Sequence, residues 1–180
     1  LDPTIRSMIG GVSDLSVRLD ELATLDLPVR VALVVENQQT ALAFQDLPGA
    51  IVLMGGGFAV KDLGRVRWLD RVPLVYWGDI DTAGLTILSA LRRYHAHTVS
   101  CLMDEATRLR FRDLWSDENV PTHAVGEGLG PDEESLRLKL LSGHFRKQGP
   151  GVRLEQERIP WPFAWSAIQD AVATHCVDAR

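Results

Sequence analysis

Cysteines and long apolar runs are both scarce in this chain. Its 180 residues include two cysteines, Cys101 and Cys176, far apart in the sequence. No CxxC or HxxxH pair occurs, which excludes the common zinc-ligand spacings. So few thiols fit a reducing, cytoplasmic location. No run of about 18 apolar residues is present, so we expect neither a membrane-spanning helix nor a membrane partner.

A surplus of basic residues is missing as well. The formal net charge is −5. This balance argues against a general binder of polyanions, because non-specific affinity for nucleic acid comes mostly from neutralising phosphates. Any contact with nucleic acid would therefore need a local basic patch or bridging metal ions.

Apolar runs alternate with helical patterns through the middle of the chain. The runs are continuous and rich in β-branched residues, as expected for strands buried on both faces. Strands are predicted over 29–37, 50–57, 72–81 and 97–104, and helices over 38–47, 59–71, 82–94 and 105–115. This alternation predicts an α/β fold with a central, mainly parallel four-stranded sheet flanked by helices.

Three parts are expected along the chain. Residues 1–28 form a helical lead-in, residues 29–116 the α/β core, and residues 117–180 a C-terminal extension that completes the domain. Within the extension, helices are predicted over 131–145 and 164–177. Because the chain opens on Leu rather than Met, a further upstream domain of a longer protein is expected.

Acidic side chains collect where the predicted strands end. Glu36 closes the first strand, and Asp79 and Asp81 close the third. In a parallel sheet these ends meet at one edge, where α/β proteins place their chemistry. If both are extended, Asp79 and Asp81 point to the same side, so either one is protonated or a cation offsets their repulsion. Carboxylate oxygens suit Mg²⁺ or Mn²⁺, which can activate water and clamp a phosphoryl group.

Simpler roles remain open for some of these acids. Asp81 precedes the helical pattern at 82–94 and could be an ordinary N-cap. Asp104, which ends the fourth strand, has the same alternative and is a weaker candidate for a metal ligand. Glu155 and Glu157 share one face if their stretch is extended. Glu155 is then either part of a charged edge strand or an extra carboxylate near the metal.

The order of these residues resembles a known family. A glutamate that closes the first strand, Glu36, and a "DxD" that closes the third resemble the Toprim domain of topoisomerases, primases and certain nucleases. Gly84 completes the matching stretch "DIDTAG". Longer stretches, "VVEN", "YWGDIDTAG", "LMDEAT" and "RLEQERIP", span residues 34–160 and resemble the C-terminal domain of the JetD family, the nuclease subunits of Wadjet plasmid-defence systems. That family also resembles the A subunit of topoisomerase VI.

The resemblance implies a Toprim fold and Mg²⁺- or Mn²⁺-dependent cleavage of double-stranded plasmid DNA. It implies that Glu36, Asp79 and Asp81 are the catalytic and metal-binding residues, with Glu36 as ligand or general base. It also implies a homodimer beside an SMC-type condensin complex, and an upstream winged-helix-like region that binds DNA. Topoisomerase VI-type enzymes use a tyrosine nucleophile, but Tyr76 is expected in a buried strand and Tyr94 at a helix end. Hydrolysis by activated water is therefore expected.

Contacts to DNA are expected from basic residues on the helices that flank the acidic edge. These residues are Lys61, Arg65, Arg92 and Arg93. Two other functions remain open. A phosphatase of the haloacid-dehalogenase type also places a nucleophilic aspartate, here Asp79, after a buried strand, but it leaves Glu36 without a role. A catalytically inactive Toprim module would only dock DNA or partners, and the intact acidic residues speak against it.

Overall fold

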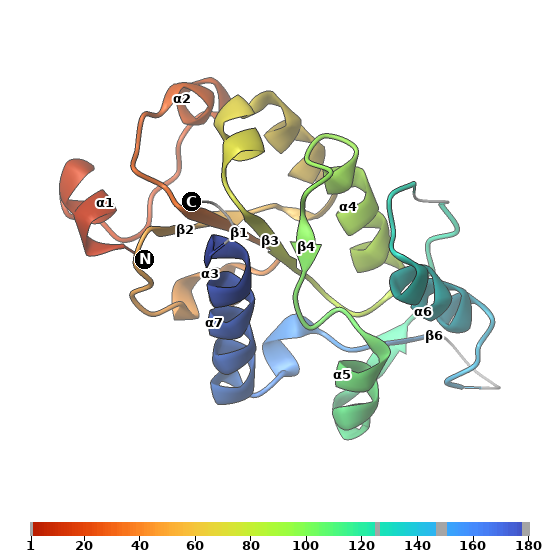
Figure 1. Cartoon of the computed structure of the whole chain (residues 1–180). Helices are drawn as coiled ribbons and strands as arrows, with labels where there is room; N and C mark the ends of the chain where they lie inside the picture. Colours follow the sequence, from red (N-terminus) through yellow and green to blue (C-terminus); the bar gives the residue numbers. More distant parts are fainter. Residues whose placement is uncertain (1, 125–126, 147–150, 178–180) are drawn as a thin grey trace.

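Four parallel strands form the central sheet of the chain (Figure 1). The computed structural model describes residues 2–124, 127–146 and 151–177. The strands lie in the order β2-β1-β3-β4, with the bounds β1 Val31–Val35, β2 Ala50–Met54, β3 Leu74–Trp77 and β4 Val99–Ser100. Helices flank this sheet, so the prediction of an α/β fold with a four-stranded parallel sheet is confirmed.

The carboxyl ends of the two central strands are level. Val35, the last residue of β1, pairs with Trp77, the last residue of β3, and also with Met54 of β2. All five residues of β1 are buried, because its "VALVV" sequence packs against neighbours on both faces of the sheet. The residues that follow β1 and β3 therefore emerge next to each other at one edge.

Two layers cover the sheet, as Figure 1 shows. The layer above it in this view contains α4 (Thr82–Arg92) and the 3₁₀ segments η1 (Gly57–Arg65) and η2 (Arg67–Arg71), and the layer below contains α3 (Gln38–Ala43) and α7 (Trp161–Val177). Aromatic edge-to-face contacts join the lower layer: the ring of Phe44 lies 5.4 Å from that of Trp161 and 5.9 Å from that of Trp165.

The segment predicted as a helix over 59–71 consists instead of η1 and η2. Its buried apolar residues recur at every third position. They are Val60, Leu63, Val66 and Leu69. A 3₁₀ helix has three residues per turn, so this spacing keeps all four on one side. The predicted helix is therefore present as 3₁₀ turns, with a break at Val66.

The other elements differ from the prediction mainly in length. The lead-in contains two short helices, because Gly10 and Gly11 take positive φ angles directly after the first of them. Their bounds and those of the later helices are α1 Pro3–Met8, α2 Leu19–Thr24, α5 Glu105–Arg110, η3 Arg112–Leu114 and α6 Pro131–Leu141. The fourth strand is confined to two residues, and the last helix begins earlier than predicted. Within the described ranges, no helix combines the length and apolar character needed to cross a membrane.

The C-terminal extension returns to the acidic edge of the sheet. Strand β6 (Gly151–Arg153) pairs with β5 (Ser116–Glu118) in an antiparallel ribbon. Leu154 then pairs with Ile80 across an antiparallel bridge, with backbone N···O distances of 2.9 and 3.2 Å. A 3₁₀ turn, η4 (Gln156–Arg158), follows at once. The extension thus supplies one wall of the region where β3 ends.

Candidate active site

Three acidic residues meet at the carboxyl edge of the sheet. Glu36 directly follows β1, Asp79 follows β3, and Asp81 is the N-cap residue of α4. The charges of Asp79 and Asp81 both raise the pKa of Glu36, in addition to the larger effect of burial. The level ends of β1 and β3 therefore bring these residues within electrostatic reach of one another.

Each of the three carboxylates is held by a hydrogen bond to one of its oxygens. The Tyr76 hydroxyl donates to Glu36 Oε1 at 2.5 Å. The main-chain N–H of Gln156 donates to Asp79 Oδ1 at 2.8 Å. The main-chain N–H of Gly84 donates to Asp81 Oδ1 at 2.7 Å, which is the N-cap bond of α4. Asp81 is thus a helix cap and a member of the acidic group at once.

Burial raises the pKa values of all three acids, and mutual repulsion adds to this at Glu36 and Asp79. Burial raises the pKa of Glu36 to about 7, and the charges of Asp79 and Asp81 add to this. Burial likewise raises the pKa of Asp79 to about 6, although its bond from the main chain of Gln156 opposes the change. The pKa of Asp81 is also raised, again chiefly by burial. A bound cation would reverse these shifts, because it favours the ionised carboxylates.

Without metal, the protein is expected to lose stability as the pH rises from about 4.5 to 7. In this range the folded chain holds more protons than the unfolded one, because the pKa of Glu36 is about 7 in the fold against an ordinary value of 4.5. The linkage relation then makes the free energy of unfolding fall with rising pH. Melting temperatures of wild type and Glu36→Gln in EDTA should diverge over this interval, with the steeper loss in wild type. If the melting temperatures of the two proteins change with pH in parallel, the raised pKa of Glu36 is contradicted.

The donor set suits a hard divalent cation in its chemistry. Glu36, Asp79 and Asp81 offer carboxylate oxygens, the ligands that Mg²⁺ and Mn²⁺ prefer, and a cation would offset their repulsion. In the part of the chain that the structure describes, no group of three or more His, Cys, Asp and Glu residues is arranged so that it could hold a metal ion. Binding a cation would therefore require these side chains to move closer together.

The two weaker candidates have structural partners. Asp104 Oδ1 accepts the main-chain N–H of Thr107 at 2.6 Å and caps α5. Glu155 forms ion pairs with Arg153 and Arg158. Burial opposes them, but these arginines hold the pKa of Glu155 below its ordinary value. The stretch is a 3₁₀ turn rather than an extended strand, and the acid of this turn whose charge reaches Asp79 is Glu157.

Two glycines are required by close approaches at the site. A Cβ atom at Gly84 would lie 2.1 Å from the main-chain oxygen of Asp79. A Cβ atom at Gly78 would lie 2.1 Å from Glu36 Oε1. The first contact is with backbone, which cannot turn aside as a side chain can. Gly84 therefore lets the first turn of α4 pack directly on the loop that carries Asp79.

Gly84→Ala is expected to lower the free energy of unfolding by about 3 kcal/mol, because the new methyl group forces backbone apart in a buried place. A matched control is Gly130→Ala, whose Cβ would have its nearest neighbour, Glu133 Oε2, at 3.6 Å. As Gly130 is the N-cap of α6, this control should lose no more than about 1 kcal/mol. Urea unfolding measures both. Equal losses in the two variants would contradict the packing argument.

Arg108 is a site-supporting residue that the sequence did not reveal. It belongs to the basic stretch "RLRFR" on a short helix, where arginines are usually exposed to solvent, but Arg108 is fully buried. Its guanidinium donates to the carbonyl oxygens of Ile80 and Val152, both at 2.8 Å, and lies over the rings of Trp115 and Phe145, 4.5 and 4.6 Å from their centroids. The peptide between the two aspartates is thereby tied to β6. The sequence did not reveal this role because the partners of Arg108 are distant in sequence.

Other unforeseen residues come from the extension. Glu118 of β5 accepts the main-chain N–H of Thr82 at 3.1 Å, so a fourth carboxylate lies at the start of α4. Burial raises the pKa of Glu118. Arg153 of β6 carries a positive charge that acts on both Asp79 and Asp81. No spacing in the sequence pointed to either residue, since β5 and β6 reach the site through contacts with residues distant in sequence.

Arg92 and Arg93 do not line the acidic edge. Helix α4 begins at that edge and runs away from it for 11 residues. Its last turn therefore lies about 16 Å further along the helix axis. Arg92 is also engaged by the protein, since its guanidinium donates to the carboxylate of Glu133 and to the carbonyl oxygen of Thr98. The prediction that these two arginines flank the acids was wrong because the direction of α4 was not considered.

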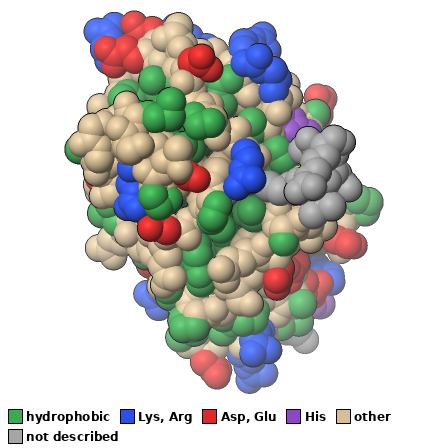
Figure 2. All heavy atoms as spheres, turned by 60° about the vertical axis from the view of Figure 1, so that its left-hand side comes forward, with side chains coloured by type: hydrophobic (Ala, Val, Ile, Leu, Met, Phe, Trp, Pro, Cys, Tyr) green, Lys and Arg blue, Asp and Glu red, His purple; other side chains and the backbone are tan. Residues whose placement is uncertain are grey.

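Lys61 and Arg65 are exposed on η1. The charge of Arg65 acts on Asp20, which belongs to α2, and a Cβ at the adjacent Gly64 would meet the ring of Tyr94 beyond the end of α4. Arg65 therefore lies toward the far end of α4. On the face shown in Figure 2, basic and acidic side chains are interspersed rather than gathered into one basic field. A DNA contact by Lys61 stays a prediction.

Neither tyrosine is suited to act as a nucleophile. Tyr76 is fully buried, and burial, together with the charge of Glu36, raises the pKa of its phenol well above the usual range. Its hydroxyl is occupied by Glu36. Tyr94 is exposed beyond the far end of α4. Among the described groups of the acidic edge, the carboxylates are the ones able to take up a proton near neutral pH.

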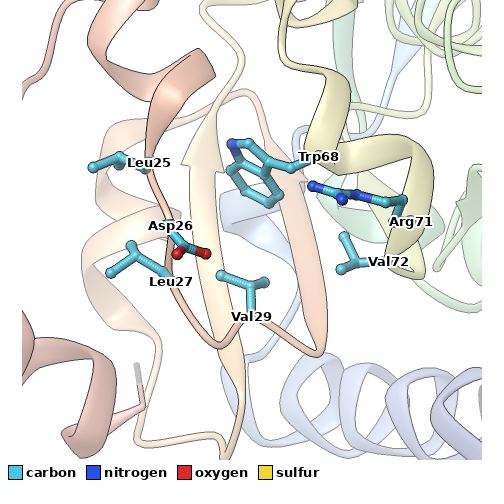
Figure 3. Close-up of a pocket in the computed structure, with 7 residues that line it drawn as sticks. All are labelled: Leu25, Asp26, Leu27, Val29, Trp68, Arg71 and Val72. Atoms are coloured by element: carbon cyan, nitrogen blue, oxygen red, sulfur yellow. The ribbon is translucent and has the colours of Figure 1, made fainter.

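A hollow of about 270 Å³ lies at the opposite edge of the sheet (Figure 3). It is bordered by Val29 and Val72, which precede β1 and β3, whereas the acids follow these strands. Figure 3 shows Trp68 and Arg71 across the hollow from Asp26. The length of the strands separates this hollow from the acidic group, so it forms no part of the candidate active site.

A parallel four-stranded α/β sheet with a glutamate after one central strand and an Asp-x-Asp pair after its neighbour is consistent with a Toprim-like fold. The family described as "Wadjet protein JetD, C-terminal" matches residues 1–168. The chain therefore belongs to the JetD C-terminal family of the Wadjet defence system. No match was found among curated proteins.

Proposed function

We propose that this chain is a divalent-metal-dependent DNA endonuclease that hydrolyses phosphodiester bonds of double-stranded plasmid DNA within the Wadjet system. The observation that carries the proposal is the meeting of Glu36, Asp79 and Asp81 at the ends of two adjacent central strands, with raised pKa values for all three. Such crowding of buried acids is costly in a purely structural role and is useful where a cation and a phosphate must be held.

Mg²⁺ or Mn²⁺ would be held by Asp79 and Asp81, with Glu36 as a third oxygen ligand or as general base. When bound, such an ion neutralises phosphate charge and lowers the pKa of water. The chain's own groups have separate tasks. Glu36, with a pKa of about 7 and an orienting bond from Tyr76, can take a proton from the attacking water. Arg153, whose charge reaches both aspartates, is suited to attract a phosphate oxygen.

The proposed partners of this chain follow from its membership of the JetD C-terminal family. We propose a homodimer that acts beside an SMC-like condensin complex of the same defence system and receives plasmid DNA from it. The charge of the chain supports this dependence on partners, because a net charge of −5 offers little attraction for DNA. The interspersed charges on the face in Figure 2 point the same way.

The 180-residue chain alone is therefore expected to nick supercoiled plasmid slowly at about 0.15 M salt, since screening at that ionic strength removes most of its remaining attraction for DNA. Gel analysis of plasmid topology over time measures this. Rapid and complete nicking by the isolated chain would contradict the proposed dependence on partners.

The function itself is tested in the assembled Wadjet system with Mg²⁺. Wild type should linearise or nick plasmid, EDTA should stop the reaction, and Glu36→Gln should remove it. Plasmid binding without cleavage in wild type would favour a docking module instead. Stoichiometric beryllofluoride on Asp79 would favour the phosphatase alternative, because that chemistry uses an aspartyl phosphate.

A further inference from the structure

Gln156 lies between the two strand ends that carry the acids, and it is fully buried. Its main-chain N–H donates to Asp79 Oδ1 at 2.8 Å. Its side-chain Oε1 accepts the main-chain N–H of Glu36 at 3.2 Å. One residue of the C-terminal extension thus contacts the end of β1 and the loop after β3 at the same time.

The side-chain amide of Gln156 is held in one orientation. Because the N–H of Glu36 must meet an oxygen, Oε1 is directed at it and Nε2 is directed elsewhere. Nε2 is buried and has no hydrogen-bond partner among the described residues. A buried donor without an acceptor forfeits the hydrogen bonds it makes in water, and such groups are rare. Methionine or leucine would avoid this loss but would leave the N–H of Glu36 without its acceptor, so the glutamine is explained by its contact with Glu36 rather than by packing alone.

The segment that carries Gln156 is fixed to the loop it contacts. Leu154, two residues earlier, is paired with Ile80 in the antiparallel bridge. Arg108 donates to the carbonyl oxygens of both Ile80 and Val152 and so links the DxD loop to β6. Gln156 is therefore a rigid connection between the two acids, and a change in its length or polarity should alter their separation.

We propose that Gln156 is a positioning residue that sets the separation of Glu36 and Asp79 and thereby the affinity of this site for a divalent cation. The inference rests on the proposed function, because it gives the acids a cation to hold. Gln156 acts through its two bonds to the chain around Glu36 and Asp79. Groups that hold metal ligands in place in this way typically change metal affinity by about 10- to 100-fold when they are removed.

The test is Mn²⁺ binding to the purified chain, followed by electron paramagnetic resonance of the free ion. Gln156→Met removes the acceptor for Glu36 but keeps the main-chain N–H that contacts Asp79, and it should weaken Mn²⁺ binding about tenfold or more. Ile159→Val is a matched control, because it trims a buried side chain of the same segment and should bind Mn²⁺ as wild type does.

A double variant separates positioning from general damage. In a Glu36→Gln background, Gln156→Met should cause little further loss, since its effect is transmitted through Glu36. Gln156→Asn is one methylene shorter and should lose as much Mn²⁺ affinity as Gln156→Met. It serves as the test variant if Gln156→Met does not fold. Two results would overturn the inference but leave the proposed function standing. One is wild-type Mn²⁺ affinity in Gln156→Met or Gln156→Asn. The other is a loss of affinity in the double variant that equals the sum of the losses in the two single variants. Absence of Mn²⁺ binding in wild type would overturn the proposed function together with the inference.

Discussion

Asp79→Asn is expected to abolish both the Mn²⁺-induced rise in melting temperature and plasmid cleavage by the Wadjet system. The metal-free variant should be at least as stable as wild type, because one charge leaves a crowded and buried group whose pKa is already raised to about 6. The metal-induced rise disappears because a ligand that binds only the folded state stabilises it by mass action. Thermal unfolding with and without Mn²⁺ measures the first effect, and plasmid gels measure the second.

Asp81→Asn and Asp104→Asn make the comparison specific. Both residues cap helices, and asparagine caps about as well as aspartate. Neither variant should therefore lose stability without metal. Asp81→Asn should nevertheless lose the Mn²⁺ effect and cleavage, whereas Asp104→Asn should keep both. If both Asp79→Asn and Asp81→Asn keep cleavage and the full Mn²⁺-induced rise in melting temperature, these residues bind no metal ion. Asp81 is then only the N-cap of α4.

Arg108→Ala should cause the largest loss of stability among single changes near the site, about 4 kcal/mol. It leaves the carbonyl oxygens of Ile80 and Val152 without their donor and opens a cavity against the rings of Trp115 and Phe145. Arg108→Met refills the cavity but not the hydrogen bonds, so its loss should be about 2 kcal/mol. Denaturant unfolding gives these values, provided that the slope with denaturant is unchanged.

The control for Arg108 is an exposed arginine of the same region. The side chain of Arg112 is 73% exposed. Arg112→Ala should therefore change the free energy of unfolding by no more than about 0.5 kcal/mol. If Arg108→Ala also changes the free energy of unfolding by no more than about 0.5 kcal/mol, Arg108 does not hold the loop of residues 79–81 to β6.

The strands and the acids at their ends could be predicted because their signals are local. A run such as "VALVV" is apolar at every position, and in a parallel sheet only a strand covered on both faces has that pattern. Two such neighbours end at the same edge, so Glu36 and Asp79 had to approach each other. The period of three in η1 and η2 was also present in the sequence, and the spacing from Val60 to Leu63 and Val66 would have identified it.

The rest of the site depends on contacts between distant parts of the chain. Gln156 reaches Asp79 because Leu154 pairs with Ile80, and the pairing of two short segments leaves no periodicity to detect. Arg108 looks like any basic residue of a helix until the two rings against which it packs are in place. Arg92 shows the opposite case. Its charge suggested DNA, but the carboxylate of Glu133 already satisfies it.

A crystal of the chain soaked in Mn²⁺ tests the central claim most directly, through the anomalous signal of the ion. The account predicts a peak between Glu36 and Asp79, with Asp81 beside it and with the carboxylates drawn closer together than in the metal-free chain. A soaked crystal without a peak at these residues, in which Tyr76 still bonds Glu36 and Gln156 still bonds Asp79, would contradict the account.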